Sequence, residues 1–140
     1  MNHILIALKE YAEHDIVGIE NNARVLSYFK DIGHKWVTND DTAWCAAFVN
    51  WILKQANKPM TGLLNARSFL TYGVSTKTPE LGDIVVLWRV KKDSPYGHVG
   101  FFIKESKEGI YILGGNQGDS VNISLFNKTQ VLDYRKLPLL

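Results

Sequence analysis

The hydrophobic pattern of this chain changes its period once, near residue 81, and that change restricts the folds it can adopt. Before residue 81 apolar residues recur at three- and four-residue steps, which is the spacing of one helical face. After residue 81 come short apolar runs rich in β-branched residues, which are typical of strands. Helices first and strands second, joined by short turns, predict an α+β fold with an antiparallel sheet.

Four helical segments are expected in the first half of the chain. The first carries Leu5, Leu8 and Ala12 on one face, and the second, over residues 25–32, ends with Gly33 in the C′ position. A short fourth helix covers residues 65–72 and stops at Gly73. The third helix begins with Asp41 or Thr42 as its N-cap, ends before Pro59, and carries Ala47, Phe48, Trp51, Ile52 and Gln55 on adjoining turns.

Five strands are expected in the second half. Residues 106–109 (SKEG) have the composition of a tight hairpin turn between two of them. The sequence contains no internal repeat, linker or low-complexity segment, so residues 1–140 are predicted to form a single domain. Its N-terminal helices should pack on a five- to six-stranded antiparallel sheet, with strands over residues 84–90, 98–104, 110–113, 121–126 and 131–134.

Charge and cysteine content exclude several classes of protein. The chain has 16 Lys and Arg against 14 Asp and Glu, a formal net charge of +2, and no basic run, so no nucleic-acid partner is expected. Its 1 cysteine excludes an intramolecular disulfide and any cysteine-rich zinc or iron–sulfur site.

The first residues of the chain carry no targeting signal. The uninterrupted apolar run 4–8 has no basic segment before it, and it is shorter than the roughly 7–15 residues of a secretory signal or the about 20 of a membrane span. We therefore expect synthesis in the cytoplasm without a signal peptide, no membrane insertion, and another route to any target outside.

Cys45 is the first candidate for chemistry. If Asp41 or Thr42 caps the third helix, Cys45 lies in its first turn, where free N–H groups and the helix dipole favour a thiolate. A small buried core residue is the alternative interpretation, because free cysteines are among the most buried residues.

His98 is the second candidate, because a polar imidazole at the head of an apolar strand needs a partner, either structural or catalytic. Gly97 and Gly100 flank it and are expected to leave open space around the ring. The other histidines, on polar helix positions or after a helix end, are expected at the solvated surface: His3, His14 and His34.

Residues 114–118 (GGNQG) follow a predicted strand and are the third candidate. They form either an ordinary loop, since Gly and Asn tolerate positive φ, or a site. A phosphate cradle is a poor match, since neither Lys-Ser/Thr nor a helix follows. Asn116 could instead hydrogen-bond one imidazole nitrogen and orient the ring, which a Cys–His pair requires.

No metal or organic cofactor is expected. The histidine spacings of zinc sites are absent. Residues 39–41 (NDD) offer oxygen atoms for calcium but lack the alternating acidic loop with its following glycine.

Cys45, His98 and Asn116 follow, in that order, the Cys–His–Asn layout of papain-like hydrolases. The chain more closely resembles the NlpC/P60 and CHAP group of peptidoglycan amidases and endopeptidases. Within it the likeness is greatest to a compact subfamily found in phage lysins and bacterial cell-wall-targeting effectors. The matching segments are residues 44–51 (WCAAFVNW), 81–88 (LGDIVVLW), 97–101 (GHVGF) and 113–118 (LGGNQG).

This resemblance implies a papain-like fold and a hydrolase with Cys45 as nucleophile, His98 as general base and acid, and Asn116 as orienting residue. Many CHAP relatives carry a Glu two positions before the Asn, where this chain has Gly114. Asp83 is expected to close a turn through backbone N–H groups. Of the tryptophans that could line a groove, Trp44 is the one we expect to bind substrate.

The implied substrate is the peptide stem of bacterial peptidoglycan, cleaved at an amide bond. Three alternatives stay open: an acyltransferase of the transglutaminase type, a catalytically silent cell-wall-binding module, and a general peptidase. A phage lysin and an injected antibacterial effector would have the same sequence features. The second would have an immunity protein as partner, and either is expected to be a monomer.

Overall fold

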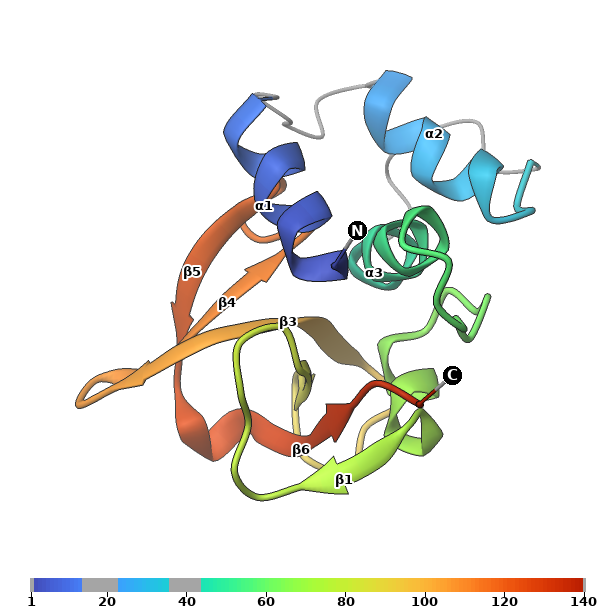
Figure 1. The fold of residues 1–140 in the computed structure, drawn as a ribbon. Helices are drawn as coiled ribbons and strands as arrows, with labels where there is room; N and C mark the ends of the chain where they lie inside the picture. The colour runs from blue at the N-terminus through green and yellow to red at the C-terminus, as the bar shows by residue number, and fades with distance from the viewer. Residues whose placement is uncertain (1, 14–22, 36–43, 140) are drawn as a thin grey trace.

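The structure is a computed structural model, and it describes residues 2–13, 23–35 and 44–139. Its order of elements is the one that the change of hydrophobic period predicts, with helices before strands (Figure 1). The helices are α1 (His3–Glu13), α2 (Ala23–Asp31), α3 (Cys45–Gln55) and the short 3₁₀ helices η1 (Ala66–Thr71) and η2 (Lys128–Gln130). The strands are β1 (Val74–Thr76), β2 (Ile84–Trp88), β3 (Gly97–Ser106), β4 (Gly109–Gly114), β5 (Asn122–Phe126) and β6 (Val131–Lys136).

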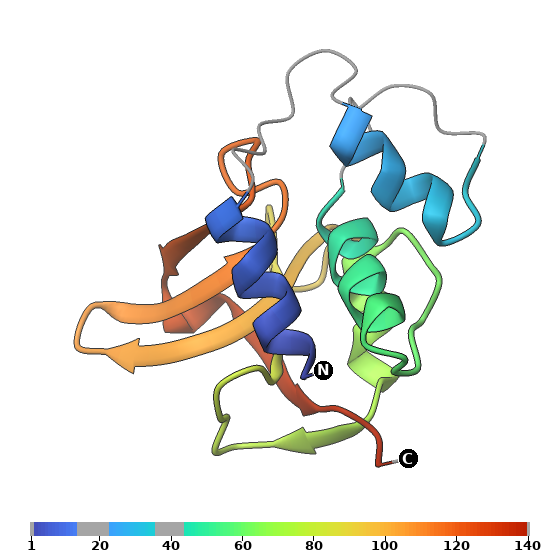
Figure 2. The ribbon, with the colours of Figure 1, turned by 45° about the horizontal axis from the view of Figure 1, so that its top comes forward.

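A 6-stranded sheet in the order β1-β6-β2-β3-β4-β5 forms the centre of the molecule, and all of its pairings are antiparallel. The hairpin expected over residues 106–109 is confirmed, with Ser106 opposite Gly109 in the β3–β4 pair. The sheet curls strongly, and the chain passes from β5 through η2 into β6 (Figures 1 and 2). The α+β class and the antiparallel sheet agree with the expectation from sequence.

Helix α3 is the central helix. Its residues from Cys45 to Leu53 are all buried, as expected for a helix covered on all sides. It contacts β3 on one side and α1 and α2 on the others, so α2 packs on α3 rather than on the sheet (Figure 2). Since α3 is fixed from all sides, its first residue is held firmly against the sheet.

Two apolar clusters lie on opposite faces of the sheet. The larger joins the helices to one face and includes Val86, Val99 and Phe101. The smaller fills the concave side of the curl and includes Leu87, Phe102 and Ile112, with Phe126 packed against it. Side chains alternate between the two faces along β3, which places the side chain of His98 on the concave side with Phe102.

Several local expectations are confirmed. Gly33 adopts a φ of 99°, and the His34 N–H donates to the Phe29 carbonyl at 2.9 Å, which closes α2. Asp83 closes the turn before β2 by accepting a hydrogen bond from the Glu80 N–H at 2.7 Å.

The short helix expected over residues 65–72 is also present, as the 3₁₀ helix η1. Other local expectations are wrong, since strand β1 was not expected. His3 is half-buried rather than solvated, since its ring packs at a tilt against Phe101 and its Nε2 lies 2.6 Å from the Gly82 carbonyl oxygen. His34 is half-buried and contacts the Gly62 carbonyl. His14 lies outside the described residues.

None of the helices in the described ranges has the length and apolar character to cross a membrane.

Close contact between β3 and β4 requires a glycine at position 100. A Cβ added to Gly100 would lie 2.4 Å from Ile112 Cγ2 and 3.0 Å from the Leu113 carbonyl oxygen. We expect Gly100→Ala to lower the free energy of unfolding by about 1–3 kcal/mol, the usual cost of overpacking. Ile112→Leu removes the Cγ2 branch at nearly constant volume and should recover part of this loss in the double variant. Urea unfolding of the four proteins measures this coupling, and strict additivity would contradict the contact.

Candidate active site

Helix α3 begins at the candidate nucleophile. Its N-cap residue is Trp44, whose side chain makes no capping bond, and Cys45 is the first helical residue. The first intrahelical bond runs from the Phe48 N–H to the Trp44 carbonyl at 3.0 Å. The N–H groups of the first turn before Phe48 are therefore free of helix partners, and with the helix dipole they favour a negative charge on sulfur. Asp41 and Thr42, expected as caps, lie outside the described residues.

His98 reaches the thiol from the neighbouring strand. It lies opposite Leu87 in the β2–β3 pair, is only 5% exposed, and stacks on Phe126 with ring centroids 5.2 Å apart. Its imidazole hydrogen-bonds the thiol of Cys45, and the Val99 backbone N–H also contacts the sulfur. The position of His98 at the end of β3 and that of Cys45 at the start of α3 thus bring the two side chains together.

The two groups change each other's protonation. Burial by itself raises the pKa of the Cys45 thiol, but hydrogen bonding and attraction to His98 outweigh burial, and the pKa falls below its ordinary value. Burial likewise opposes the charged imidazole, yet its contacts with Cys45 and Gln117 raise the pKa of His98. Both shifts favour a thiolate–imidazolium pair, which is the reactive form of a cysteine nucleophile.

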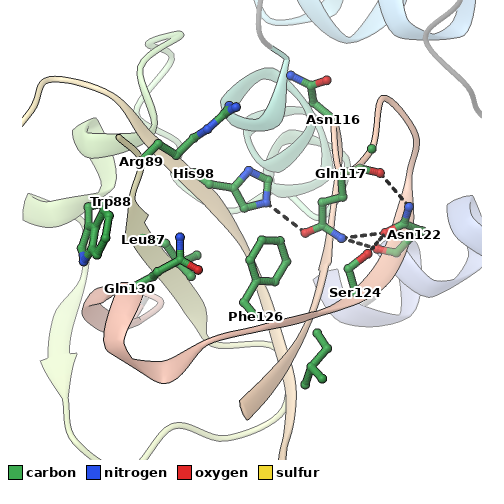
Figure 3. A pocket seen from close by; sticks show the side chains of 12 residues that line it. Leu87, Trp88, Arg89, His98, Asn116, Gln117, Asn122, Ser124, Phe126 and Gln130 are labelled. Atoms are coloured by element: carbon green, nitrogen blue, oxygen red, sulfur yellow. Dashed lines mark hydrogen bonds between the residues drawn. The ribbon is translucent and has the colours of Figure 1, made fainter. Parts of the chain in front are cut away.

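The third member of the site is Gln117, which sequence reasoning did not identify. His98 Nε2 lies 2.9 Å from Gln117 Oε1 (Figure 3). The Gln117 amide nitrogen donates to the Ile112 carbonyl at 3.1 Å and to the Asn122 carbonyl at 2.8 Å. With its NH₂ group satisfied by acceptors, Gln117 offers His98 only its oxygen, so Nε2 carries a proton. The other ring nitrogen, Nδ1, is therefore the one that faces the thiol.

The assignment of the orienting role to Asn116 is corrected by this geometry. Asn116 lines the same pocket, but its φ of 56° places it in the left-handed region, and within the described part of the chain its side chain has no hydrogen-bond partner. The residue that contacts His98 is the next one along. The glycine-rich loop does lie beside His98, but a backbone turn of this kind cannot be predicted from composition.

The glycines in this loop allow neighbouring side chains to pack against its backbone, and they do not leave open space. A Cβ added to Gly114 would lie 2.6 Å from Gln117 Oε1, and one added to Gly115 would lie 2.7 Å from Phe48 Cβ. The expected open space around His98 is also absent, since an added Cβ at Gly97 would lie 2.9 Å from the Leu87 carbonyl and Gly100 is packed against Ile112. The glycines that flank His98 thus allow β2 and β4 to lie close to β3.

Trp44 is not placed to line a groove. Its side chain is fully buried, stacks on Tyr28, and supports the loop at Gly115, whose added Cβ would lie 2.8 Å from the indole ring. Trp88 is the tryptophan that lines the pocket, and its indole N–H donates to the Thr129 carbonyl at 3.1 Å. The two differ because Trp44 precedes the buried helix, whereas Trp88 ends a strand at the edge of the concave side.

A pocket of about 530 Å³ opens on the concave side of the sheet, next to His98 and Gln117 (Figure 3). Cys45 is 4% exposed and does not line it. Arg89 is the one permanently charged side chain among the lining residues. These are Leu87, Trp88, Arg89, His98, Asn116, Gln117, Gly118, Asn122, Ser124, Leu125, Phe126 and Gln130.

Within the described ranges, no three His, Cys, Asp or Glu side chains gather closely enough to hold a metal ion. Residues 39–41, considered for calcium from the sequence, lie outside those ranges.

Comparison with known proteins gives a family match. The family model described as CHAP domain matches residues 37–116, which is more than half of the chain. The matched segment contains Cys45 and His98 and ends one residue before Gln117. A search of the curated proteins finds no match.

The paired pKa shifts predict how the thiol reacts with pH. Iodoacetamide reacts with thiolates, so wild-type Cys45 should be alkylated well below the ordinary pKa of a thiol. In His98→Ala the partner that lowers the Cys45 pKa is removed while burial remains, so the alkylation profile should move to higher pH. His34→Ala, which removes an imidazole away from the site, is the matched control and should leave the profile unchanged. An unchanged profile in folded His98→Ala would mean that the imidazole does not act on Cys45.

The same alkylation reaction distinguishes the role of Gln117 from that of Asn116. Gln117→Ala removes the acceptor that orients His98, and the alkylation rate at neutral pH should fall by about tenfold to a hundredfold, as for other small misplacements of reacting groups. Asn116→Ala should retain a rate close to wild type. Circular dichroism checks that both variants fold. A larger loss in Asn116→Ala than in Gln117→Ala would return the orienting role to Asn116.

Proposed function

Because the chain belongs to the CHAP-domain family, whose members are generally hydrolases that act on peptidoglycan, we propose that it is a cysteine hydrolase of the peptidoglycan peptide stem. The observation that carries the proposal is the buried arrangement of Cys45, His98 and Gln117. A thiol with a lowered pKa, an imidazole within its reach and an amide that fixes the imidazole are the parts of a nucleophilic acyl-transfer site.

The first half of the reaction forms an acyl-enzyme. The Cys45 thiolate attacks the carbonyl carbon of an amide, and a carbon–sulfur bond forms as the carbonyl oxygen takes the negative charge. The Cys45 backbone N–H has no partner among the described residues and is positioned at the helix start to stabilise this oxyanion. The imidazolium of His98 then gives its Nδ1 proton to the leaving nitrogen as the carbon–nitrogen bond breaks.

Water completes the reaction. Neutral His98 removes a proton from a water molecule, whose oxygen attacks the thioester carbonyl carbon. The carbon–sulfur bond then breaks, the carboxylic acid product leaves, and the Cys45 thiolate and the His98 imidazolium are restored. Throughout, the hydrogen bond to Gln117 keeps Nδ1 directed at the reacting atoms. No step of this mechanism calls for a cofactor.

The proposed biological role follows from the substrate. Peptidoglycan lies outside the cytoplasmic membrane, so the enzyme acts at the cell wall, as an amidase or endopeptidase delivered there as a phage lysin or as an antibacterial effector. In the second case a cognate immunity protein would protect the producing cell.

The proposal predicts that hydrolysis of peptidoglycan depends on the thiol. Purified sacculi should lose turbidity with the wild-type protein, whereas Cys45→Ala should show no loss above background while keeping its far-UV circular dichroism. Because the chain has 1 cysteine, wild-type protein pretreated with iodoacetamide is a matched control and should be equally inactive. Mass spectrometry of the released muropeptides identifies the bond that is cut. Near wild-type activity in folded Cys45→Ala would exclude the cysteine mechanism.

A further inference from the structure

Arg89 is a cation at the pocket next to His98 and Gln117, and the mechanism above does not use it. It follows the end of β2, its side chain is exposed, and it lines the pocket together with His98 and Asn116. In Figure 3 Arg89 and Asn116 extend on one side of the His98 ring, and Phe126 lies on the other. That side is the one from which Nδ1 projects, toward the thiol.

The backbone at Arg89 is held in place although its side chain is free to reach a ligand. The Arg89 N–H donates to the Tyr96 carbonyl at 3.3 Å, and its own carbonyl accepts from the Lys91 N–H at 2.8 Å and from the buried Ser94 hydroxyl at 2.6 Å. The hydrogen bond from the Lys91 N–H to the Arg89 carbonyl closes a γ-turn at Val90, which has a φ of 69°. Such a conformation is strained for a β-branched residue, and strain of this kind gathers at functional sites.

Among the described residues, no acidic side chain neutralises the charge of Arg89. In the described part of the chain its guanidinium has no hydrogen-bond or ion-pair partner, and no Asp or Glu lines the pocket. The positive charge of Arg89 opposes part of the rise in the pKa of His98, as expected for two cationic groups that line one pocket. An unpaired cation in the pocket that His98 lines is suited to bind an anionic group of the substrate.

We propose that Arg89 forms a carboxylate-binding subsite, which selects substrates with a free carboxylate close to the scissile amide. This inference rests on the proposed hydrolase function and names what the site recognises. Stem peptides carry carboxyl groups that occur either free or as carboxamides. Arg binds a planar carboxylate with two parallel hydrogen bonds, whereas a carboxamide offers one acceptor and no charge. Arg89 also lines a second, smaller hollow, together with Val90, Tyr96 and Gly97.

A pair of small alkylating agents tests the subsite without any assumption about the substrate. Iodoacetate and iodoacetamide differ only in a carboxylate or a carboxamide next to the reactive carbon. For the reaction with Cys45, the rate with iodoacetate divided by the rate with iodoacetamide should be lower in Arg89→Gln than in wild type by about threefold to tenfold. The reason is that a nearby cation attracts the anionic reagent. The difference should shrink at 1 M salt, where the Debye length is about 3 Å.

Lys91→Gln is the matched control for this measurement. It removes the same charge from the same loop, but Lys91 is strongly exposed and does not line the pocket. Its ratio of rates should equal that of wild type. An equal fall in both variants would show that only the general charge of the loop matters, and an unchanged ratio in Arg89→Gln would show that no anion binds there. Either result overturns the subsite.

Sacculi test the same subsite on the polymer. Their carboxylates are converted to carboxamides with carbodiimide and ammonium ions, and a muramidase confirms that the treated glycan is still digestible. Wild-type enzyme should digest mock-treated sacculi faster than amidated ones by about tenfold to a hundredfold, the range of a charge-assisted hydrogen bond, and Arg89→Gln should lose this preference. Equal digestion of both by wild type overturns the subsite and leaves the hydrolase function intact. Digestion of neither overturns the proposed function.

Discussion

The hydrogen bond between His98 Nε2 and Gln117 Oε1 decides how the rest of the site can act. An imidazole has two nitrogens, and only one can face the sulfur in a useful protonation state. Gln117 determines that Nδ1 faces the sulfur. Its NH₂ group is already bound to the main-chain oxygens of Ile112 and Asn122, so that it offers His98 Nε2 only an acceptor. The turn after β4 and the start of β5 are thereby connected to the protonation state of the nucleophile. This connection explains why residues 114–118, none of which is ionisable, are packed so closely.

Burial is the second constraint, and by itself it opposes the chemistry. A thiolate and an imidazolium are both disfavoured away from water, and each of the two side chains is almost fully buried. The opposing effect of burial is outweighed because each charge would stabilise the other and because backbone N–H groups of Ala46 and Val99 also contact the sulfur. Losing either partner would leave one group in surroundings that favour its neutral form. The reactivity of Cys45 is therefore a property of the α3–β3 junction and not of the residue alone.

Sequence reasoning predicted the features that depend on periodicity and on local chain geometry. The change of hydrophobic period gave the α+β class, Gly33 marked the end of α2, and Cys45 and His98 were identified from their places at element ends. It did not predict the features that depend on a contact between distant segments. Trp44 was expected to line a groove, but its indole ring is packed against Gly115. Sequence alone cannot show whether Asn116 or Gln117 faces His98, because that depends on the left-handed backbone conformation of Asn116.

The crowding at Gly114 has a consequence for how this site could change by mutation. The resemblance to CHAP proteins led us to expect a Glu at that position, but here an added Cβ would meet the Gln117 oxygen at 2.6 Å. A single Gly114→Glu change would displace the group that orients His98 before the new carboxylate could take over its task. Loss of Gln117 alone would leave the imidazole without an acceptor. The two arrangements are therefore separated by intermediates that are both impaired, and a lineage that has adopted one would rarely exchange it for the other one residue at a time.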